Sequence, residues 1–270
     1  MTDCTAERFE FQGPGGRPIV ARFDGGQIVS DGGATLLHSV EQRVGILRRF
    51  AECFVDYRDP RRVEHKVEEL VVQRVFALAL GYEDLNDHDE LRRDPLLAAM
   101  AGKCDPEGED RRLARDRGAA LAGKSTLHRL EWSVAGEGAA DRYRRFSLDG
   151  DAVDRLFVEV FIESFARPPR RIILDLDATD NPLHGHQEGR FFHGYYDCYC
   201  YLPLYIFCGD HLLCARLRRS NIDASAGTVE ELHQLPAHLR RPWPAGSRWM
   251  RGDPRPTPRS CHPGQPPLTT

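Results

Sequence analysis

The sequence lacks three patterns that would place it in a class of proteins at once. It contains no apolar run near the roughly 20 residues that span a bilayer. Its first residues, MTDCTAERFEFQG, lack the basic and then apolar pattern of a signal peptide. Its 8 cysteines form no CxxC pair, so the spacing of a zinc ribbon is absent. These absences predict a cytoplasmic protein whose cysteines are reduced.

The sequence also lacks an overall basic charge and is poor in lysine. Its formal net charge is −4, and Lys66, Lys103 and Lys124 are the only lysines among 37 basic residues. A local basic patch would matter more for nucleic-acid binding than this sum. Arginine suits bidentate contacts with phosphate, although GC-rich codons explain so uniform a bias more simply. Composition alone therefore assigns no partner.

The first part of the chain has the apolar periodicity of helices. Spacings of three and four predict helices over residues 34–55, 63–80 and 149–166. Two short helices separated by Pro95 are expected between the second and the third, and another helix follows Lys124. A short strand is expected near residues 17–23, before the first helix. Residues 1–168 are therefore predicted to be a mostly helical region.

Two motifs in this region are interpreted as structural. His88, with its acidic neighbours Asp87, Asp89 and Glu90, could ligate a metal, but a solvated helix face is expected because nothing makes these side chains converge. The string GAALAGKS, residues 118–125, matches the phosphate-loop pattern G-x4-G-K-[ST] literally. That motif requires an apolar strand before it, and DRRLARDR stands there instead.

An apolar run that ends in carboxylates organises the second part of the chain. Ile172, Ile173 and Leu174 lead to Asp175 and Asp177, with a further acid at position 180. Because side chains alternate along a strand, Ile173, Asp175 and Asp177 share one face. Carboxylates at the C-terminal end of a strand suit a hard divalent cation such as Mg²⁺.

Further strands are expected after this acidic strand. A polar loop is predicted over residues 181–194, and residues 202–208 are rich in aromatic and branched side chains. Gly209-Asp210 is a two-residue connection typical of a tight hairpin, from which residues 212–218 return as a strand. A helix is expected over residues 228–239.

The stretch DLDATDNPLHGHQEGRFFHGYYDCYCYLPLYIFCGDHLLCARLR, residues 175–218, carries a resemblance to a known family. It is similar to the opening of the catalytic domain of DDE-type transposases of bacterial insertion sequences. The resemblance extends more loosely from Phe23 to Asp253. It implies an α+β (or α/β) fold with a ribonuclease H-like mixed sheet. It also implies DNA as the partner, namely terminal inverted repeats and target DNA, with a homodimer as a further assembly to test.

The resemblance also implies a two-metal site that uses Mg²⁺ or Mn²⁺. The family's first acid sits in an Asp-x-Thr context, which maps onto Asp177 with Thr179 after it. Asp175 is the competing candidate by spacing alone. The second acid maps onto Asp253, at the end of Trp249-Met250-Arg251-Gly252-Asp253. The family's third acid, a Glu much further along, has no counterpart.

The resemblance stops abruptly after Asp253. The family continues into Ser-Gly-Phe and a helix, whereas this chain continues into Pro254-Arg255-Pro256. Half of the 18 prolines lie in residues 236–270, and proline blocks regular structure. A shifted reading frame in GC-rich DNA would produce such a Pro/Arg-rich tail. We therefore expect an incomplete ribonuclease H-like domain over residues 169–253, a disordered tail over 254–270, and no activity from a chain truncated or frameshifted after Asp253.

The polar loop and the residues beside it supply the remaining candidates for metal binding and DNA contact. His184, His186, Glu188 and His193 could bind Zn²⁺, but contacts with DNA or with the rim of the active site are preferred. The candidates for DNA contact are Thr179, His184, His186, Arg190 and His193. The aromatic residues Phe191, Phe192, Tyr195 and Tyr196 could stack on an unpaired base near the cut, and core packing is the alternative.

Three functions stay open at this point. The leading one is an incomplete transposase whose family cuts and joins DNA. Helices before the sheet, residues 1–168, could hold the DNA ends. The second is a non-catalytic fragment that recognises transposon ends and competes with the full-length enzyme. The third is a His-rich metal hydrolase of another class.

Overall fold

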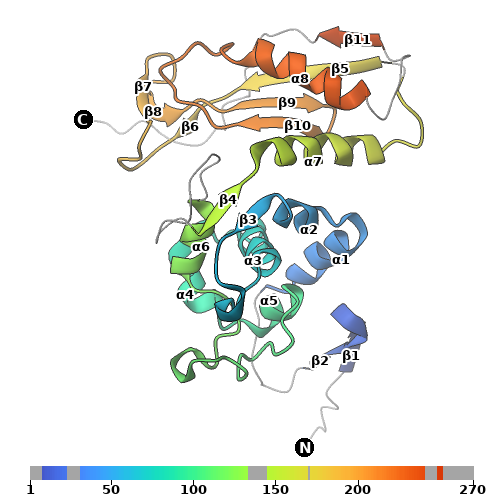
Figure 1. Cartoon of the computed structure of the whole chain (residues 1–270), viewed down its shortest axis with the longest axis vertical. Coiled ribbons are helices and arrows are strands. Elements are labelled where there is room, and N and C mark those ends of the chain that lie inside the picture. The colour runs from blue at the N-terminus through green and yellow to red at the C-terminus, as the bar shows by residue number, and fades with distance from the viewer. Residues whose placement is uncertain (1–7, 23–30, 133–144, 170, 241–247, 252–270) are drawn as a thin grey trace, which may run out of the picture. The chain divides into compact units, whose positions relative to one another are not determined.

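A computed structural model describes residues 8–22, 31–132, 145–169, 171–240 and 248–251 (Figure 1). The chain divides into two compact units, residues 1–153 and 154–270, named here the N-terminal unit and the C-terminal unit. The division falls inside α7 (Gly150–Glu163). Among the described residues, no helix is long and apolar enough to cross a membrane.

The N-terminal unit is mostly helical, as the periodicity predicts. Its α-helices are α1 (Ala34–Val44), α2 (Ile46–Ala51), α3 (Val67–Ala79), α4 (His88–Leu91), α5 (Pro95–Met100) and α6 (Lys124–Glu131). Leu70 and Val71 of α3 belong to one apolar cluster, whereas Phe76 and Ala77 belong to another. A helix that is apolar on several sides is buried, so α3 is the centre of this unit's core.

The first predicted helix is divided in two. Residues 34–55 were expected to be continuous, but Gly45 has a φ of 64° and ends α1. The Glu41 carboxylate then accepts the N–H groups of Leu47 and Arg48 at 3.0 and 3.1 Å, which caps the start of α2. Glycine adopts a left-handed φ without steric cost. The break is therefore encoded by one residue that the apolar spacing does not register.

Two strand pairs stand beside these helices. Strand β2 (Pro18–Arg22) was expected, and its antiparallel partner β1 (Arg8–Gln12) was not. Strand β3 (Phe54–Asp56) replaces the predicted end of the first helix and pairs with β4 (Phe146–Leu148). These partners lie far apart in the sequence, so local spacing could not reveal the pairing.

The C-terminal unit is built on a 4-stranded sheet in the order β10-β9-β5-β11. Strand β9 (Leu204–Cys208) pairs antiparallel with both β5 (Arg171–Ala178) and β10 (His211–Arg216). Strand β11 (Arg248–Arg251) pairs parallel with β5. Parallel pairing requires a crossover, which contains helix α8 (Thr228–Arg240). This mixed sheet, together with the helices, agrees with the α+β fold that was predicted, and the ribonuclease H-like form of the sheet stays a prediction.

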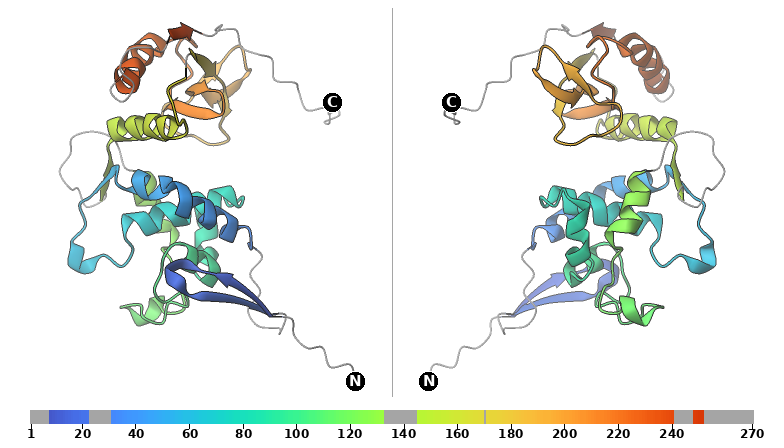
Figure 2. Two further views of the ribbon diagram at one scale, coloured as in Figure 1. Left: turned by 90° about the vertical axis from the view of Figure 1, so that its right-hand side faces the viewer. Right: turned by 90° about the vertical axis from the view of Figure 1, so that its left-hand side faces the viewer.

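Helices α7 and α8 cover one face of this sheet (Figure 2). Val158 and Phe161 of α7, and Leu235 of α8, join Ile172 and Leu174 of β5 in one buried apolar cluster. The two helices therefore pack against one face of β5, and the carboxylates lie on the opposite face.

The expected polar loop contains strands at both of its ends. Strands β6 (Asn181–Pro182) and β7 (Phe191–His193) pair antiparallel with β8 (Cys198–Tyr201), which lies between them. The prediction of a loop over residues 181–194 is wrong there, because such short strands are too brief to show alternation. Residues 254–270 lie outside the described residues, so the disorder of this tail stays a prediction.

Candidate functional site

Strand β5 carries acidic residues to the end of the sheet. Ile172 and Leu174 are 0% and 5% exposed on the helical face. Asp175 is exposed and Asp177 is half-buried on the opposite face. The predicted division of the two faces is therefore confirmed. The buried side anchors the strand, and the open side presents the carboxylates.

Aromatic side chains stand beside both of these carboxylates. In the register of β5 and β9, Asp177 pairs with Tyr205 and Asp175 pairs with Phe207. The centroids of the two aromatic rings lie 6.2 Å apart. Side chains paired across a ladder lie on the same face, with Cβ atoms about 5 Å apart. An apolar ring beside a carboxylate displaces water, which strengthens the attraction between that carboxylate and a cation.

A further tyrosine, Tyr196, approaches the same end of β5. Its hydroxyl donates a hydrogen bond to the carbonyl of Ala178 at 3.4 Å. Burial and the negative charges of Asp180 and Asp177 raise the pKa of this phenol. The charges of Asp180 and Asp177 therefore act on the same phenol.

Strands β5 and β11 run toward the same edge of the sheet, and β5 extends four residues beyond the end of β11. The two strands are parallel, and Arg251 at the end of β11 pairs with Leu174. In the sequence, Asp177 follows Leu174 by three positions and Asp253 follows Arg251 by two. Asp253 itself lies outside the described residues.

One protein family matches most of the chain. The family described as Transposase DDE domain group 1 matches residues 11–256. The chain belongs to the DDE transposases. The search of curated proteins and the search of solved structures gave no match. The resemblance found in the sequence is thus confirmed at the level of the family, and DNA is the substrate that this family implies.

The predicted DNA contacts of the transposase lie in and beside the 3-stranded sheet β6-β8-β7. Arg190 donates a hydrogen bond from Nη2 to Nδ1 of His186 at 2.8 Å. The ring of His193 lies 4.9 Å from the ring of Tyr196. Thr179 is half-buried directly after β5. Tyr196 thus links one of the candidate histidines to the acidic strand end.

The histidines of this region do not form a zinc site among the described residues. No group of three or more His, Cys, Asp or Glu side chains is arranged to hold a metal ion in the described parts of the chain. His184 and Glu188 are exposed, and His186 is hydrogen bonded to Arg190. Among the described residues, the acids of β5 do not form a group of three metal ligands either. Carboxylates suit Mg²⁺ or Mn²⁺ in kind, but this site requires a further ligand.

Sequence reasoning missed Tyr199 and Tyr205. The only signal for Tyr205 was its alternation with Phe207, and a register between two strands was needed to place it opposite Asp177. Tyr199 lies under the guanidinium of Arg190, whose Cζ is 4.6 Å from the ring centroid. Nothing local in the sequence predicts that contact.

The acidic motif around His88 is not a solvated helix face at the histidine itself. His88 is 0% exposed, so the prediction is wrong for this residue. The Gln73 amide donates to its Nδ1 at 3.1 Å. Burial of the neutral ring, rather than solvation or metal binding, is its role in the core.

The phosphate-loop pattern has a structural use as well. The ammonium group of Lys124 lies 2.8 Å from a carboxylate oxygen of Asp89 and donates to Asn86 at 3.0 Å. A short 3-10 turn, Ala114–Asp116, precedes the motif in place of a strand. Lys124 therefore ties the start of α6 to the segment around α4.

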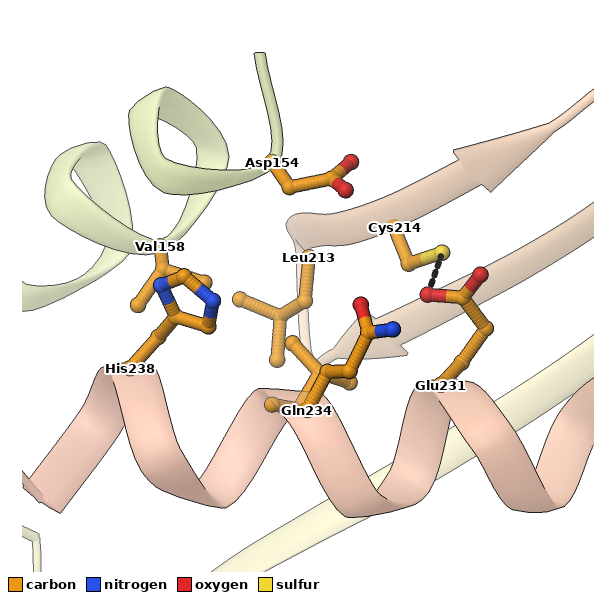
Figure 3. Close-up of a pocket in the computed structure, with 8 residues that line it drawn as sticks. Asp154, Val158, Leu213, Cys214, Glu231, Gln234 and His238 are labelled. Carbon is orange, nitrogen blue, oxygen red and sulfur yellow. Dashed lines mark hydrogen bonds between the residues drawn. The ribbon is translucent and has the colours of Figure 1, made fainter. Parts of the chain in front are cut away.

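A shallow pocket lies on the helical side of the sheet in the C-terminal unit (Figure 3). It is lined by Asp154, Val158, Leu213, Cys214, Glu231, Gln234, Leu235 and His238. The Cys214 thiol donates to Glu231 at 3.5 Å. Burial and the Glu231 charge raise the pKa of this thiol to about 12. The thiol is therefore protonated at neutral pH and is not a nucleophile.

Proposed function

We propose that this chain is the N-terminal part of an insertion-sequence transposase that binds transposon-end DNA and holds a divalent cation between Asp177 and Asp253. The parallel pairing of β5 with β11 is the observation that carries this proposal. Neighbouring strands lie about 4.8 Å apart. Carboxylates near the C-terminal ends of two such strands can share one ion.

Asp177 is preferred to Asp175 as the first metal ligand. Asp177 stands one residue before the end of β5, and Asp175 stands three residues before it. Its carboxylate and that of Asp180 both act on Tyr196, whereas Asp175 is exposed beside Phe207. The residue that lies nearer the convergence of acids is the better ligand.

The family chemistry is metal-assisted cleavage and joining of DNA strands. Two divalent ions, Mg²⁺ or Mn²⁺, would stabilise the attacking and leaving oxygens of the phosphodiester. In this chain Asp177 and Asp253 would hold the ion, and Thr179, His184, His186, Arg190 and His193 would contact the DNA. These 270 residues contain no counterpart of the family's third acid. Loss of such a group typically costs at least about 10²-fold in rate, so we propose that the chain alone does not cleave.

The test uses labelled duplexes that carry the inverted repeats flanking the gene. We expect binding that is stronger than to a scrambled duplex and that weakens as salt rises, with no cleavage product in Mg²⁺ or Mn²⁺. Equal affinity for the scrambled duplex would overturn end recognition. Metal-dependent cleavage that is lost in Asp177→Asn would overturn the proposed inactivity and retain the metal assignment.

A second function, competition with a complete transposase, follows from the separate cores. The N-terminal unit has its own buried apolar clusters and is compact by itself. If this unit recognises the transposon ends, as we propose, end recognition does not require a complete catalytic domain. Added to a complete transposase acting on the same ends, this chain should suppress cleavage in proportion to the ends it occupies. Unchanged cleavage at full occupancy would contradict competition. A homodimer stays a prediction, which sedimentation would check.

A further inference from the structure

The outer face of β7 and β8 is aromatic where a polar face is expected. Phe191 pairs with Cys200 on the inner face, and Cys200 is 0% exposed. Phe192 pairs with Tyr199 on the outer face, and these side chains are 51% and 49% exposed. A sheet with one buried face usually presents polar side chains on the other. This pair therefore calls for a functional explanation.

The two rings meet edge to face, and a cation is stacked on one of them. The centroids of Phe192 and Tyr199 lie 5.5 Å apart, with 71° between the ring planes. The guanidinium carbon of Arg190 lies 4.6 Å from the Tyr199 centroid. We name Phe192, Tyr199 and Arg190 the aromatic platform. His186, which accepts a hydrogen bond from Arg190, stands at its margin.

The aromatic platform is tied to the acidic end of β5. The N–H of Leu183 donates to the carbonyl of Tyr199 at 2.9 Å. Leu183 follows Asp180 by three residues, which span at most about 11 Å when fully extended. With the spacing of about 5 Å between strands, Tyr199 lies within about 16 Å of Asp180. One bound DNA strand of a few nucleotides can reach both places.

We propose that the aromatic platform stacks an unpaired DNA base beside the acidic end of β5. This inference rests on the proposed function and adds single-stranded DNA to its substrates. Exposed aromatic rings combined with arginine bind single-stranded nucleic acid because every base has a flat apolar face and a nearby phosphate. Two side chains offer far less surface than the roughly 800 Å² that a stable protein interface takes from each partner. A base fits the platform better than a protein does.

The experiment uses the full chain and a single-stranded oligonucleotide of about 12 nucleotides, a length within the site sizes of such proteins. One central base is 2-aminopurine, whose emission falls when it stacks on a ring. We expect quenching on binding, and a loss of affinity of at least about fivefold in Phe192→Ala and in Tyr199→Ala. Tyr199→Phe keeps the ring and should retain both the quenching and the affinity.

Val229→Ala is the matched control. Val229 is 55% exposed on α8, which packs against the 4-stranded sheet of the same unit, so its loss should change neither signal. Far-ultraviolet circular dichroism of each variant separates misfolding from a local effect. Wild-type binding without quenching, or alanine variants that bind and quench like wild type, would overturn the proposal. Binding to duplex ends is measured in parallel. If the wild type binds duplex ends but the variants do not affect single-strand binding, only the platform proposal is wrong. If the wild type does not prefer duplex ends to a scrambled duplex, the proposed function is wrong.

Discussion

Asp177 stands directly opposite Tyr205 in the antiparallel register of β5 and β9. The core under this pair is apolar, since Ile206 and Leu174 are 0% and 5% exposed on the other face. The strand end that carries Asp177 is therefore held by packing on one side. An acid on a strand that is held in place needs little reorganisation to bind a metal ion, which is what a metal site requires.

Arg216 is predicted to be the main electrostatic support of the C-terminal unit. Its guanidinium forms a two-pronged ion pair with Asp154 and donates to Glu231 at 2.6 Å. Both carboxylates are only 16% exposed. Arg216→Met would leave two buried charges unpaired and should lower the free energy of unfolding by about 3 kcal/mol. Urea unfolding at pH 7 measures this.

A second variant checks the cause of that loss. Arg216→Met combined with Asp154→Asn and Glu231→Gln removes the unpaired charges, so it should recover much of the lost stability. If the single variant costs less than about 0.5 kcal/mol, the level of an exposed pair, the ion pairs do not support the unit.

Acid should destabilise the N-terminal unit through its two buried histidines. Burial, then Lys103, Arg111, Arg58 and Arg92, lower the pKa of His65 to about 3. Because the folded pKa lies below the unfolded value of 6.5, the unfolded state takes up the proton first. The stabilising effect is thus complete above pH 6.5 and is lost as the pH falls toward 3.

The pKa of His88 is lowered as well, and the contacts of its ring explain why. Burial and then Arg74 lower its pKa to about 4, against the opposing charges of Asp87 and Asp89. The Gln73 amide donates to its Nδ1, so a proton there would meet a donor. Between pH 7 and pH 5, His88 should cost the folded state about 2 kcal/mol.

Denaturant unfolding across this pH range tests the role of His88. His88→Gln should flatten the dependence of unfolding free energy on pH between pH 7 and pH 5. Equal pH dependence in wild type and His88→Gln would show that His88 does not titrate as described.

Gly108 and Gly102 form a matched pair for a steric test. Both have a left-handed φ, of 75° and 82°. A Cβ at Gly108 would lie 2.6 Å from the backbone nitrogen of Ala120, and a Cβ at Gly102 would meet nothing within 4 Å. Gly102→Ala should cost about 1–2 kcal/mol for backbone conformation alone. Gly108→Ala should cost at least about 2 kcal/mol more, because the clash is with backbone. Equal costs in urea unfolding would contradict this packing.

The predicted departure from the family after Asp253 can be tested at the gene, since the family match ends at residue 256. We predict that another reading frame past codon 253 encodes a Ser-Gly-Phe-like segment and a later helix with a Glu. Resequencing the locus from codon 230 to several hundred bases past codon 270, with translation in all frames, checks this. If no frame continues the family pattern, the frameshift hypothesis is wrong.

The strand that carries the acids could be predicted because its information is local. Alternation of Ile172, Ile173 and Leu174 with the carboxylates after them determines which face each residue occupies. The partners of that strand could not be predicted in the same way. The parallel neighbour β11 and the position of Tyr205 depend on pairing between distant segments, for which apolar spacing carries no signal.

Errors in the helical region have two physical origins, the conformation of a single residue and a contact between distant residues. Gly45 breaks a predicted helix through its own backbone conformation, which a count of apolar positions passes over. His88 lies in a polar run, yet it is buried because Gln73, 15 residues away, offers it a hydrogen bond. Only part of the aromatic platform could be predicted from the sequence. Phe192 was a candidate for stacking, whereas Tyr199 required the register of β7 and β8.

The most direct test of the central claim is the affinity of the protein for Mn²⁺. Titration calorimetry would compare wild type with Asp177→Asn, Asp253→Asn and Asp175→Asn. We predict that Asp177→Asn and Asp253→Asn each lower the affinity by at least about tenfold, equivalent to about 1.4 kcal/mol, and that Asp175→Asn stays close to wild type. Wild-type affinity in Asp177→Asn, with loss of binding in Asp175→Asn, would contradict the assignment of the metal site.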